Sequence, residues 1–101
     1  MSWSIYLTID TGGPESHGVW DCCELGSINH HLKTLGFDFE VLEGMTAGEI
    51  RERAVNTLER LRAHTKLFPG VCYTDRHVLR FTEFVEACKR HPACKLEIVG
   101  R

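Results

Sequence analysis

Hydrophobic and polar residues alternate along this chain with two different periods, and each period predicts a type of secondary structure. The longest regular segment runs from Thr46 to Lys66 and repeats apolar residues with the period of a helix, at Ala47, Ile50, Ala54, Leu58 and Leu61. Thr46 and Glu49 have the spacing of a capping box, in which each side chain satisfies an unpaired N–H at the start of a helix. The segment is therefore predicted to be one amphipathic helix.

Two other segments, Trp3 to Asp10 and Lys95 to Val99, alternate with the period of two that is typical of half-buried strands. After the first come TGGPES, a run of turn-forming residues, and then His17 to Glu24, a short segment rich in residues that are common in strands. Trp3 to Asp10 and His17 to Glu24 together predict an antiparallel hairpin. Lys95 to Val99 predicts a closing strand, which we expect to pair beside the first strand because its backbone groups need partners.

Shorter patterns predict two more helices. Ser27 is placed to cap a short helix that ends at Gly36, and on it Asn29 and His30 are expected to face solvent. Asp75 to about Arg90 predicts a third helix, with Phe81 and Val85 on the inner face and Leu79 on the outer side. Between them, Phe37 to Leu42 fits either a brief strand or an extended linker.

These elements predict a single α+β domain that spans residues 1–101. The sheet is expected to be small, antiparallel or mixed, and built from the N-terminal hairpin and the C-terminal strand. About three helices are expected to pack on one face of it, because neither the sheet face nor the helical stripes can stay in water.

Composition narrows the classes of partner. The chain is 43% hydrophobic and 26% charged, and its formal net charge of −2 gives no basic surface for nucleic acid or for an anionic membrane. No apolar run approaches the roughly 20 residues of a membrane span, and the first residues lack the pattern of a signal peptide. We therefore expect a cytosolic protein, in which the five cysteines are free thiols and mostly buried.

Three stretches of the sequence resemble a known group of proteins: WSIYLTIDTGGPE, GFDFEVLEGMTAGE and EACKRHPACKLEIVG. The chain is similar to uncharacterised small proteins of actinobacteria and their phages, which share the opening Trp-Ser strand, the Asp-Thr-Gly-Gly-Pro-Glu loop and the closing Ala-Cys-x-x-His-Pro segment. It departs from them at Cys23 to Ser27, where the group has Asn-Tyr-Thr-x-Asn. The resemblance implies an accessory role and names no reaction.

One motif could belong to an enzyme. Asp10-Thr11-Gly12 follows an apolar strand, as in the homodimeric retroviral-type aspartic proteases, where two carboxylates share one proton across the dimer axis. The spacing to the later Gly100-Arg101 does not fit, and the helical centre of the chain differs from a nearly all-β protease. A turn that ends a strand is the alternative interpretation.

The histidines and cysteines suggest a second chemistry, a structural zinc site. The candidate ligands are Cys88, His91 and Cys94, or a cluster of His17, Cys22, Cys23, His30 and His31. Neither set has a familiar spacing, so burial of the thiols and solvation of the imidazoles is the alternative. A cysteine nucleophile paired with a histidine also remains open, because sequence alone does not show which thiol is exposed and activated.

We therefore expect a small non-enzymatic interaction protein that needs no cofactor and binds a protein partner, and that is compatible with a homodimer. Its working surface is predicted at one end of the sheet, where the hairpin connection is longer than a tight turn needs. The predicted residues are Glu15, His17, Trp20, Asp21, Asn29 and His30. Trp20 fits a core position and a binding anchor equally well.

We expect the purified protein to carry no stoichiometric zinc and to stay folded in a chelator, because its thiols are predicted to be buried as small apolar side chains. Elemental analysis, and circular dichroism with and without EDTA, measure this. About one zinc per chain with loss of structure on chelation would contradict the prediction, and would identify Cys88, His91 and Cys94 as the ligands.

Overall fold

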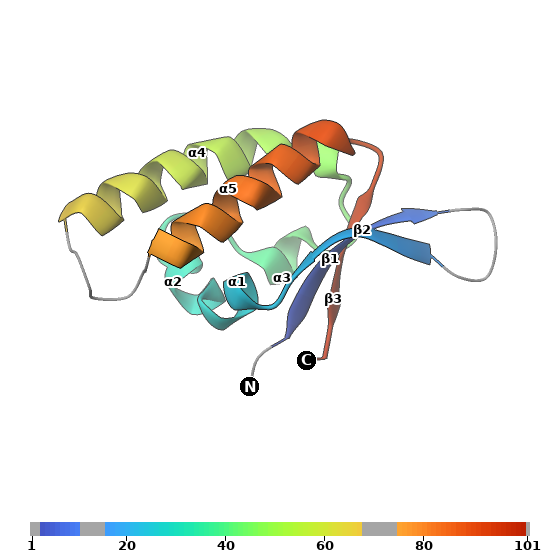
Figure 1. Ribbon diagram of the computed structural model, residues 1–101, viewed down its shortest axis with the longest axis horizontal. Helices are drawn as coiled ribbons and strands as arrows, with labels where there is room; N and C mark the ends of the chain where they lie inside the picture. The colour runs from blue at the N-terminus through green and yellow to red at the C-terminus, as the bar shows by residue number, and fades with distance from the viewer. Residues whose placement is uncertain (1–2, 11–15, 68–74, 101) are drawn as a thin grey trace.

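The computed structural model describes residues 3–10, 16–67 and 75–100 (Figure 1). These ranges form one three-stranded sheet and five helices, in the order β1 (Ser4–Asp10), β2 (Ser16–Cys22), α1 (Glu24–Ser27), α2 (Asn29–Thr34), α3 (Phe39–Leu42), α4 (Ala47–Leu67), α5 (Asp75–Arg90) and β3 (Lys95–Val99). The predicted α+β fold is confirmed. None of the described helices combines the length and the apolar composition that a membrane span needs.

The sheet has the strand order β2-β1-β3, and both pairs are antiparallel. The prediction that the C-terminal strand pairs with the first strand is therefore confirmed. Ile5 lies between Cys22 and Ile98, and Leu7 lies between Trp20 and Leu96. Ile5 and Leu7 are completely buried, because this face of the sheet is covered by the helices.

A β-bulge interrupts the pairing of β1 with β2. Leu7 lies opposite Trp20 and Thr8 lies opposite Gly18, so Val19 is an extra residue on the β2 side. A bulge changes the direction of neighbouring side chains and increases the local twist. The pattern of alternating faces along β2 is therefore shifted at Val19.

Helix α4 buries the apolar stripe that the sequence predicts, from Ala47 to Leu61. Its predicted cap is confirmed in part. The Glu49 N–H donates to the Thr46 hydroxyl oxygen at 3.3 Å, as expected. The Glu49 carboxylate, however, accepts the Thr46 hydroxyl at 2.8 Å rather than the backbone N–H of a capping box.

Backbone carbonyls from the end of the chain complete this cap. The Ala47 N–H donates to the Cys94 carbonyl at 2.7 Å, and the Gly48 N–H donates to the Pro92 carbonyl at 2.9 Å. The first N–H groups of a helix have no partners within the helix. Here the segment that leads into β3 supplies carbonyl acceptors for two of these N–H groups. The start of α4 is thereby fixed against the C-terminal strand.

The same region closes the outer edge of β3. The Gly44 N–H donates to the Leu96 carbonyl at 2.8 Å, and the Leu96 N–H donates to the Met45 carbonyl at 3.0 Å. The Glu43 carboxylate accepts the Ile98 N–H at 2.9 Å. Three backbone groups on the outer side of β3, both groups of Leu96 and the N–H of Ile98, are therefore paired within the chain.

The segment after β2 corrects one prediction. Ser27 does not cap a helix, because the chain forms two short helices with Ile28 between them, and the N-terminus of α2 has no side-chain cap. The Ser27 hydroxyl instead donates back to the Glu24 carbonyl at 2.6 Å. The predicted stop at Gly36 agrees with its φ of 85°, a conformation that glycine adopts easily.

A second correction concerns Asn29 and the segment from Phe37 to Leu42. Asn29 was expected in solvent but is only 3% exposed. Its amide N–H donates to Asp38 Oδ1 at 3.0 Å, and its oxygen accepts the Phe39 N–H at 3.0 Å. Asp38 also accepts the Glu40 N–H at 2.9 Å, so residues 39–42 form one helical turn, α3, rather than a strand or an extended linker.

Aromatic rings fill the space between the sheet and the helices. Phe37, Phe39, Phe81 and Phe84 are essentially buried and contact one another at ring-centroid distances of 4.9 to 6.4 Å. Most of these contacts are edge-to-face, which is a favoured geometry for aromatic pairs. The inner face of α5, predicted from its apolar period, is confirmed at Phe81 and Val85, which are both buried.

We expect Thr46→Ala to lower the free energy of unfolding by about 1 kcal/mol, because it removes the acceptor for the Glu49 N–H. Leu58→Ala should cost roughly 2–5 kcal/mol, because Leu58 is 7% exposed and its loss opens a cavity. Urea unfolding of both variants measures the difference. Leu79→Ala is the control, since Leu79 is 53% exposed. Equal losses of unfolding free energy for Leu58→Ala and Leu79→Ala would show that Leu58 does not lie on the buried face of α4.

Candidate functional site

The second edge of the sheet is formed by β2, and it is not closed in the same way as β3. In the described part of the chain, no strand other than β1 pairs with β2. Gly18, Val19 and Asp21 are exposed along this strand. An edge strand presents unpaired N–H and C=O groups to which another extended segment can bind.

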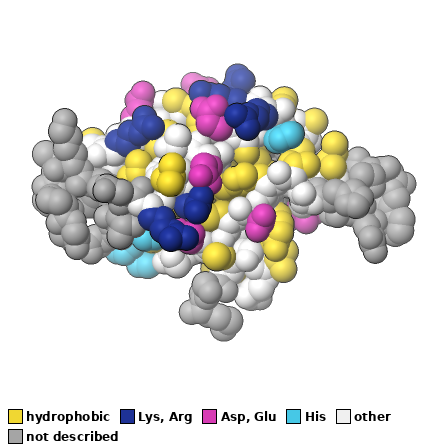
Figure 2. Space-filling model, viewed as in Figure 1, with side chains coloured by type: hydrophobic (Ala, Val, Ile, Leu, Met, Phe, Trp, Pro, Cys, Tyr) yellow, Lys and Arg dark blue, Asp and Glu magenta, His cyan; other side chains and the backbone are white. Residues whose placement is uncertain are grey.

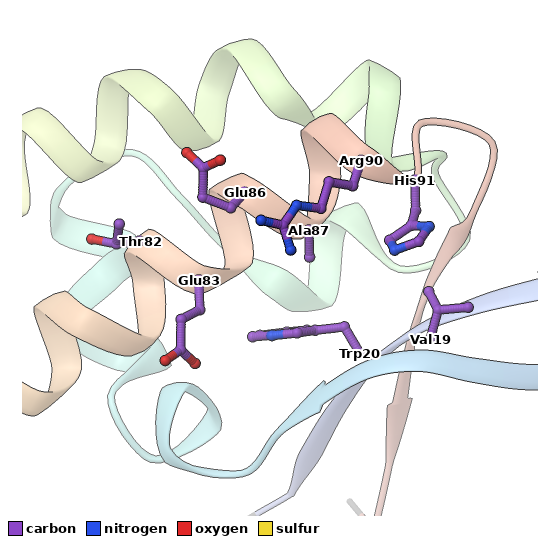
Figure 3. A pocket seen from close by; sticks show the side chains of 8 residues that line it. All are labelled: Val19, Trp20, Thr82, Glu83, Glu86, Ala87, Arg90 and His91. Carbon is purple, nitrogen blue, oxygen red and sulfur yellow. The ribbon is translucent and has the colours of Figure 1, made fainter.

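A cavity of about 330 Å³ lies between this edge and α5 (Figure 3). Val19 and Trp20 line it from β2, and residues from Thr82 to His91 line it from α5 and the residue after it. Hydrophobic side chains are visible between α5 and the sheet on this face, with charged side chains around them (Figure 2). The cavity is an apolar groove with a charged rim.

Trp20 belongs both to the core and to this groove. Its ring centroid lies 5.4 Å from that of Phe84, and the side chain is packed against the core while remaining partly exposed. Figure 3 shows the indole extending beneath Ala87, between β2 and α5. Core packing on one side holds the ring in place, and the groove exposes the other part of it.

The bulge explains why Val19 lines the groove together with Trp20. Successive residues of a regular strand point to opposite faces, so a pair of neighbours would not normally share one cavity. Val19 is the extra residue of the bulge and is 38% exposed. Two consecutive apolar side chains therefore line the β2 side of the groove.

One end of α5 is tied to α1 by charged side chains. Arg76 Nε donates to Glu24 Oε2 at 2.6 Å, and Arg80 Nε donates to Glu24 Oε1 at 3.3 Å. The hydrogen bond from Arg76, together with that from Arg80, holds the pKa of Glu24 below its usual value. Arg80 also donates to both carboxylate oxygens of Glu83, at 2.8 and 2.7 Å, so Glu83 is an occupied acceptor on the rim of the groove.

Glu86 and Arg90 are the other charged residues on the rim of the groove, and they differ in whether they have an ion-pair partner. The Glu86 carboxylate lies 3.6 Å from the ammonium of Lys89 and points away from Trp20 in Figure 3. Arg90 has no carboxylate within 4.0 Å among the described residues, and its guanidinium extends back along α5 over the groove. Arg90 is therefore the charge on this rim that has no ion-pair partner in the described part of the chain.

The structure separates the residues that were predicted to form the working surface. Trp20 lines the groove, and Asp21 is exposed on the neighbouring position of β2. His30 lies on α2 and lines a different concavity with Trp3 and Glu40. Asn29 is buried, as described above, so its expected exposure is wrong.

Two of the predicted site residues fall on the hairpin outside the described side chains. Glu15 lies outside the described residues, and His17 is described only as a backbone position of β2. Sequence reasoning did not identify Ala87, Arg90 or His91 as groove residues. The helical period did assign Leu79, Glu83, Glu86 and Arg90 to the outer side of α5, and that was the available signal for this face.

The candidate zinc ligands that the structure describes are not grouped into a site. Cys88 and Cys94 are buried, whereas His91 lines the groove. In the second set, Cys22 is buried, Cys23 is exposed, and the ring centroids of His30 and His31 lie 3.9 Å apart with the rings tilted by 43°. Within the described ranges, no three His, Cys, Asp or Glu side chains are grouped so that they could hold a metal ion.

Burial also controls the chemistry of the thiols. It raises the pKa of Cys22 and of Cys94, and it raises the pKa of Cys88 to about 12. These three thiols are therefore protonated at neutral pH and poor nucleophiles. Cys23 is the exposed thiol among the four described cysteines.

The protease motif gains no support from the fold. Asp10 ends β1, and Thr11 and Gly12 lie outside the described residues. Five of the eight described elements are helices, in contrast to the nearly all-β architecture of retroviral-type proteases.

No protein-family model, curated protein or solved structure matches this chain.

We expect iodoacetamide at pH 8 to label Cys23 in the native protein, and to label Cys22, Cys88 and Cys94 only after unfolding. The reason is that the last three are buried, and burial raises the pKa of each. Peptide mass spectrometry at several labelling times, with and without urea, measures the rates. Native labelling of Cys88 as fast as that of Cys23 would show that the core around α5 is open.

Proposed function

We propose that this protein is a non-enzymatic interaction module of the cytosol, and that it binds an extended segment of a protein partner at the edge of β2. The segment would add a fourth strand to the sheet beside β2, and its side chains would enter the groove under α5. Strand addition of this kind takes its affinity from main-chain hydrogen bonds and its specificity from pockets for alternate side chains.

The observation that carries this proposal is the difference between the two edges of the sheet. The chain uses residues 43–46 to pair the outer side of β3, whereas β2 has no such cover among the described residues. Natural proteins usually protect exposed edges, because an unprotected edge invites pairing with other chains. An edge that adjoins a groove with a partly exposed tryptophan is more easily explained as a binding surface than as a defect.

The surface proposed here keeps four residues of the sequence prediction. His17, Trp20 and Asp21 belong to β2, and Glu15 directly precedes this strand in the sequence. Trp20 is suited to be the anchor, since aromatic side chains held rigidly near the centre of an interface contribute much of the binding energy. His30 would belong to a separate contact, because it lines a different concavity from the groove that Trp20 lines.

The remaining features are consistent with a binding role. Three of the four described thiols are buried with raised pKa values, which favours core packing over nucleophilic catalysis. The resemblance to small actinobacterial and phage proteins fits an accessory protein that acts through a partner.

We expect Val19→Lys to abolish binding of peptides selected from a displayed random library against the native protein. A lysine at an edge strand opposes the addition of another strand, and Val19 is exposed at the groove. Amide hydrogen exchange should show peptide-dependent protection of residues 18–22 in the native protein. The melting temperature should change little, because surface substitutions usually alter stability by less than about 0.5 kcal/mol.

Val99→Lys is the matched control for this experiment, since Val99 is a strand valine that is 53% exposed on β3. It should bind the selected peptides as the native protein does. Equal binding by Val19→Lys, or protection confined to residues outside β2, would contradict the proposal.

A further inference from the structure

The face of the sheet that points away from the helices carries side chains that the groove does not use. Ile5 and Leu7 face the helices and are completely buried, so Tyr6 between them points to the opposite face, where it is partly exposed. All five described helices lie on the first side of the sheet (Figure 1). In the described part of the chain, no helix therefore covers the face that carries Tyr6, and we call it the open face.

Tyr6 is flanked by one acidic residue on each neighbouring strand. Asp21 of β2 lies directly opposite Tyr6 on one side, and Glu97 of β3 lies directly opposite it on the other. Directly opposite residues point to the same face of a sheet, with Cβ atoms roughly 4.5–5.5 Å apart. The bulge lies beyond this pair, between Leu7 and Thr8, so the register at Tyr6 is regular. The phenol ring therefore lies between two carboxylates.

These two carboxylates are not neutralised by nearby cations of the described chain. Asp21 is exposed and Glu97 is partly exposed, and neither forms an ion pair within the described ranges. Lys95 is exposed two residues from Glu97, on the same face, but its ammonium lies more than 4.0 Å from every described carboxylate. The centre of the open face thus combines an aromatic ring with two unpaired negative charges.

Gly18 allows the ring of Tyr6 to lie against the backbone of β2. A Cβ atom at position 18 would lie 3.3 Å from Tyr6 Cδ1 and 3.9 Å from Tyr6 Cε1. A side chain at this position would therefore crowd the ring. Contact with the strand limits the movement of the ring, and a ligand that stacks on an already ordered side chain binds at a lower cost in entropy.

We propose that the open face binds an arginine side chain of a protein partner, with the guanidinium stacked on Tyr6 and donating hydrogen bonds to Asp21 and Glu97. Arginine fits better than lysine, because its guanidinium is planar, stacks on aromatic rings and presents donors along several edges. Adjacent strands lie about 4.8 Å apart, so the two carboxylates stand on either side of the ring, where such donors point. The inference does not depend on strand addition, because the groove lies on the other face of the sheet.

The probe is the end-blocked tripeptide Gly-Arg-Gly, titrated at low salt into the isotopically labelled full chain. The same peptide with lysine, or with citrulline, is the comparison, since citrulline has the shape of arginine without its charge. Amide NMR spectra locate the site and give the dissociation constants. We expect the arginine peptide to shift the amide signals of Tyr6, Asp21 and Glu97, and to bind about fivefold more tightly than either comparison peptide.

Asp21→Asn combined with Glu97→Gln should weaken binding of the arginine peptide about tenfold, because both changes remove charge and keep the shape of the side chain. The matched control is Glu52→Gln combined with Glu59→Gln, which removes the same charge from exposed positions of α4. It should change the dissociation constant by less than about twofold, since exposed charges beyond a Debye length are screened.

Tyr6→Leu should weaken binding about fivefold, whereas Tyr6→Phe keeps an aromatic face and should bind within about twofold of the native protein. Thermal melts show whether each variant is folded. Citrulline or lysine peptides that bind as tightly as the arginine peptide would overturn the proposal. So would amide shifts confined to the helices, or the absence of binding. Val19→Lys, which tests strand addition, should still bind the arginine peptide, so the two proposals can fail separately.

Discussion

The attachment of α4 to the segment that leads into β3 is the constraint on which the rest of the structure depends. The Cys94 carbonyl accepts the Ala47 N–H, and Leu96 exchanges backbone hydrogen bonds with Gly44 and Met45. These contacts satisfy helix donors that would otherwise be unpaired, and they also cover the outer edge of β3. Because β1 is central and residues 43–46 pair with the outer side of β3, β2 is the uncovered edge of the sheet in the described part of the chain.

The groove exists because α5 is held over β2 at two points. Phe84 packs on Trp20 in the middle of the helix, and Glu24 binds Arg76 and Arg80 toward its start. Of these contacts the aromatic one carries more stability, since ion pairs on the surface are screened by solvent and contribute little. The ion pairs matter more for position, because they occupy Glu83 through Arg80 and leave Arg90 as the unbalanced charge of the rim.

The elements that were predicted correctly from the sequence are those in which the apolar pattern repeats several times. The stripe of α4, the inner face of α5 and the alternation of the strands each follow from burial of one face, which local sequence records. Asn29 and the turn of α3 were mispredicted because a four-residue helix has no repeat to detect, and a buried asparagine is stable only through partners nine and ten residues away. Trp20 was selected for its chemistry, whereas Ala87 and Arg90 come to line the groove only once α5 is docked on β2.

The bulge at Val19 limits which extended segments could pair with the accessible edge of β2. A regular edge strand offers an even row of donors and acceptors to any extended chain, which makes it prone to non-specific pairing. The extra residue interrupts that row and increases the local twist, so that fewer segments can pair along the whole of β2. It also brings Val19 beside Trp20 in the groove, which adds apolar contact for a strand that does fit. For the proposed function, the same irregularity would weaken pairing that depends on the backbone alone and strengthen pairing that depends on side chains, which is the balance that specific strand binding requires.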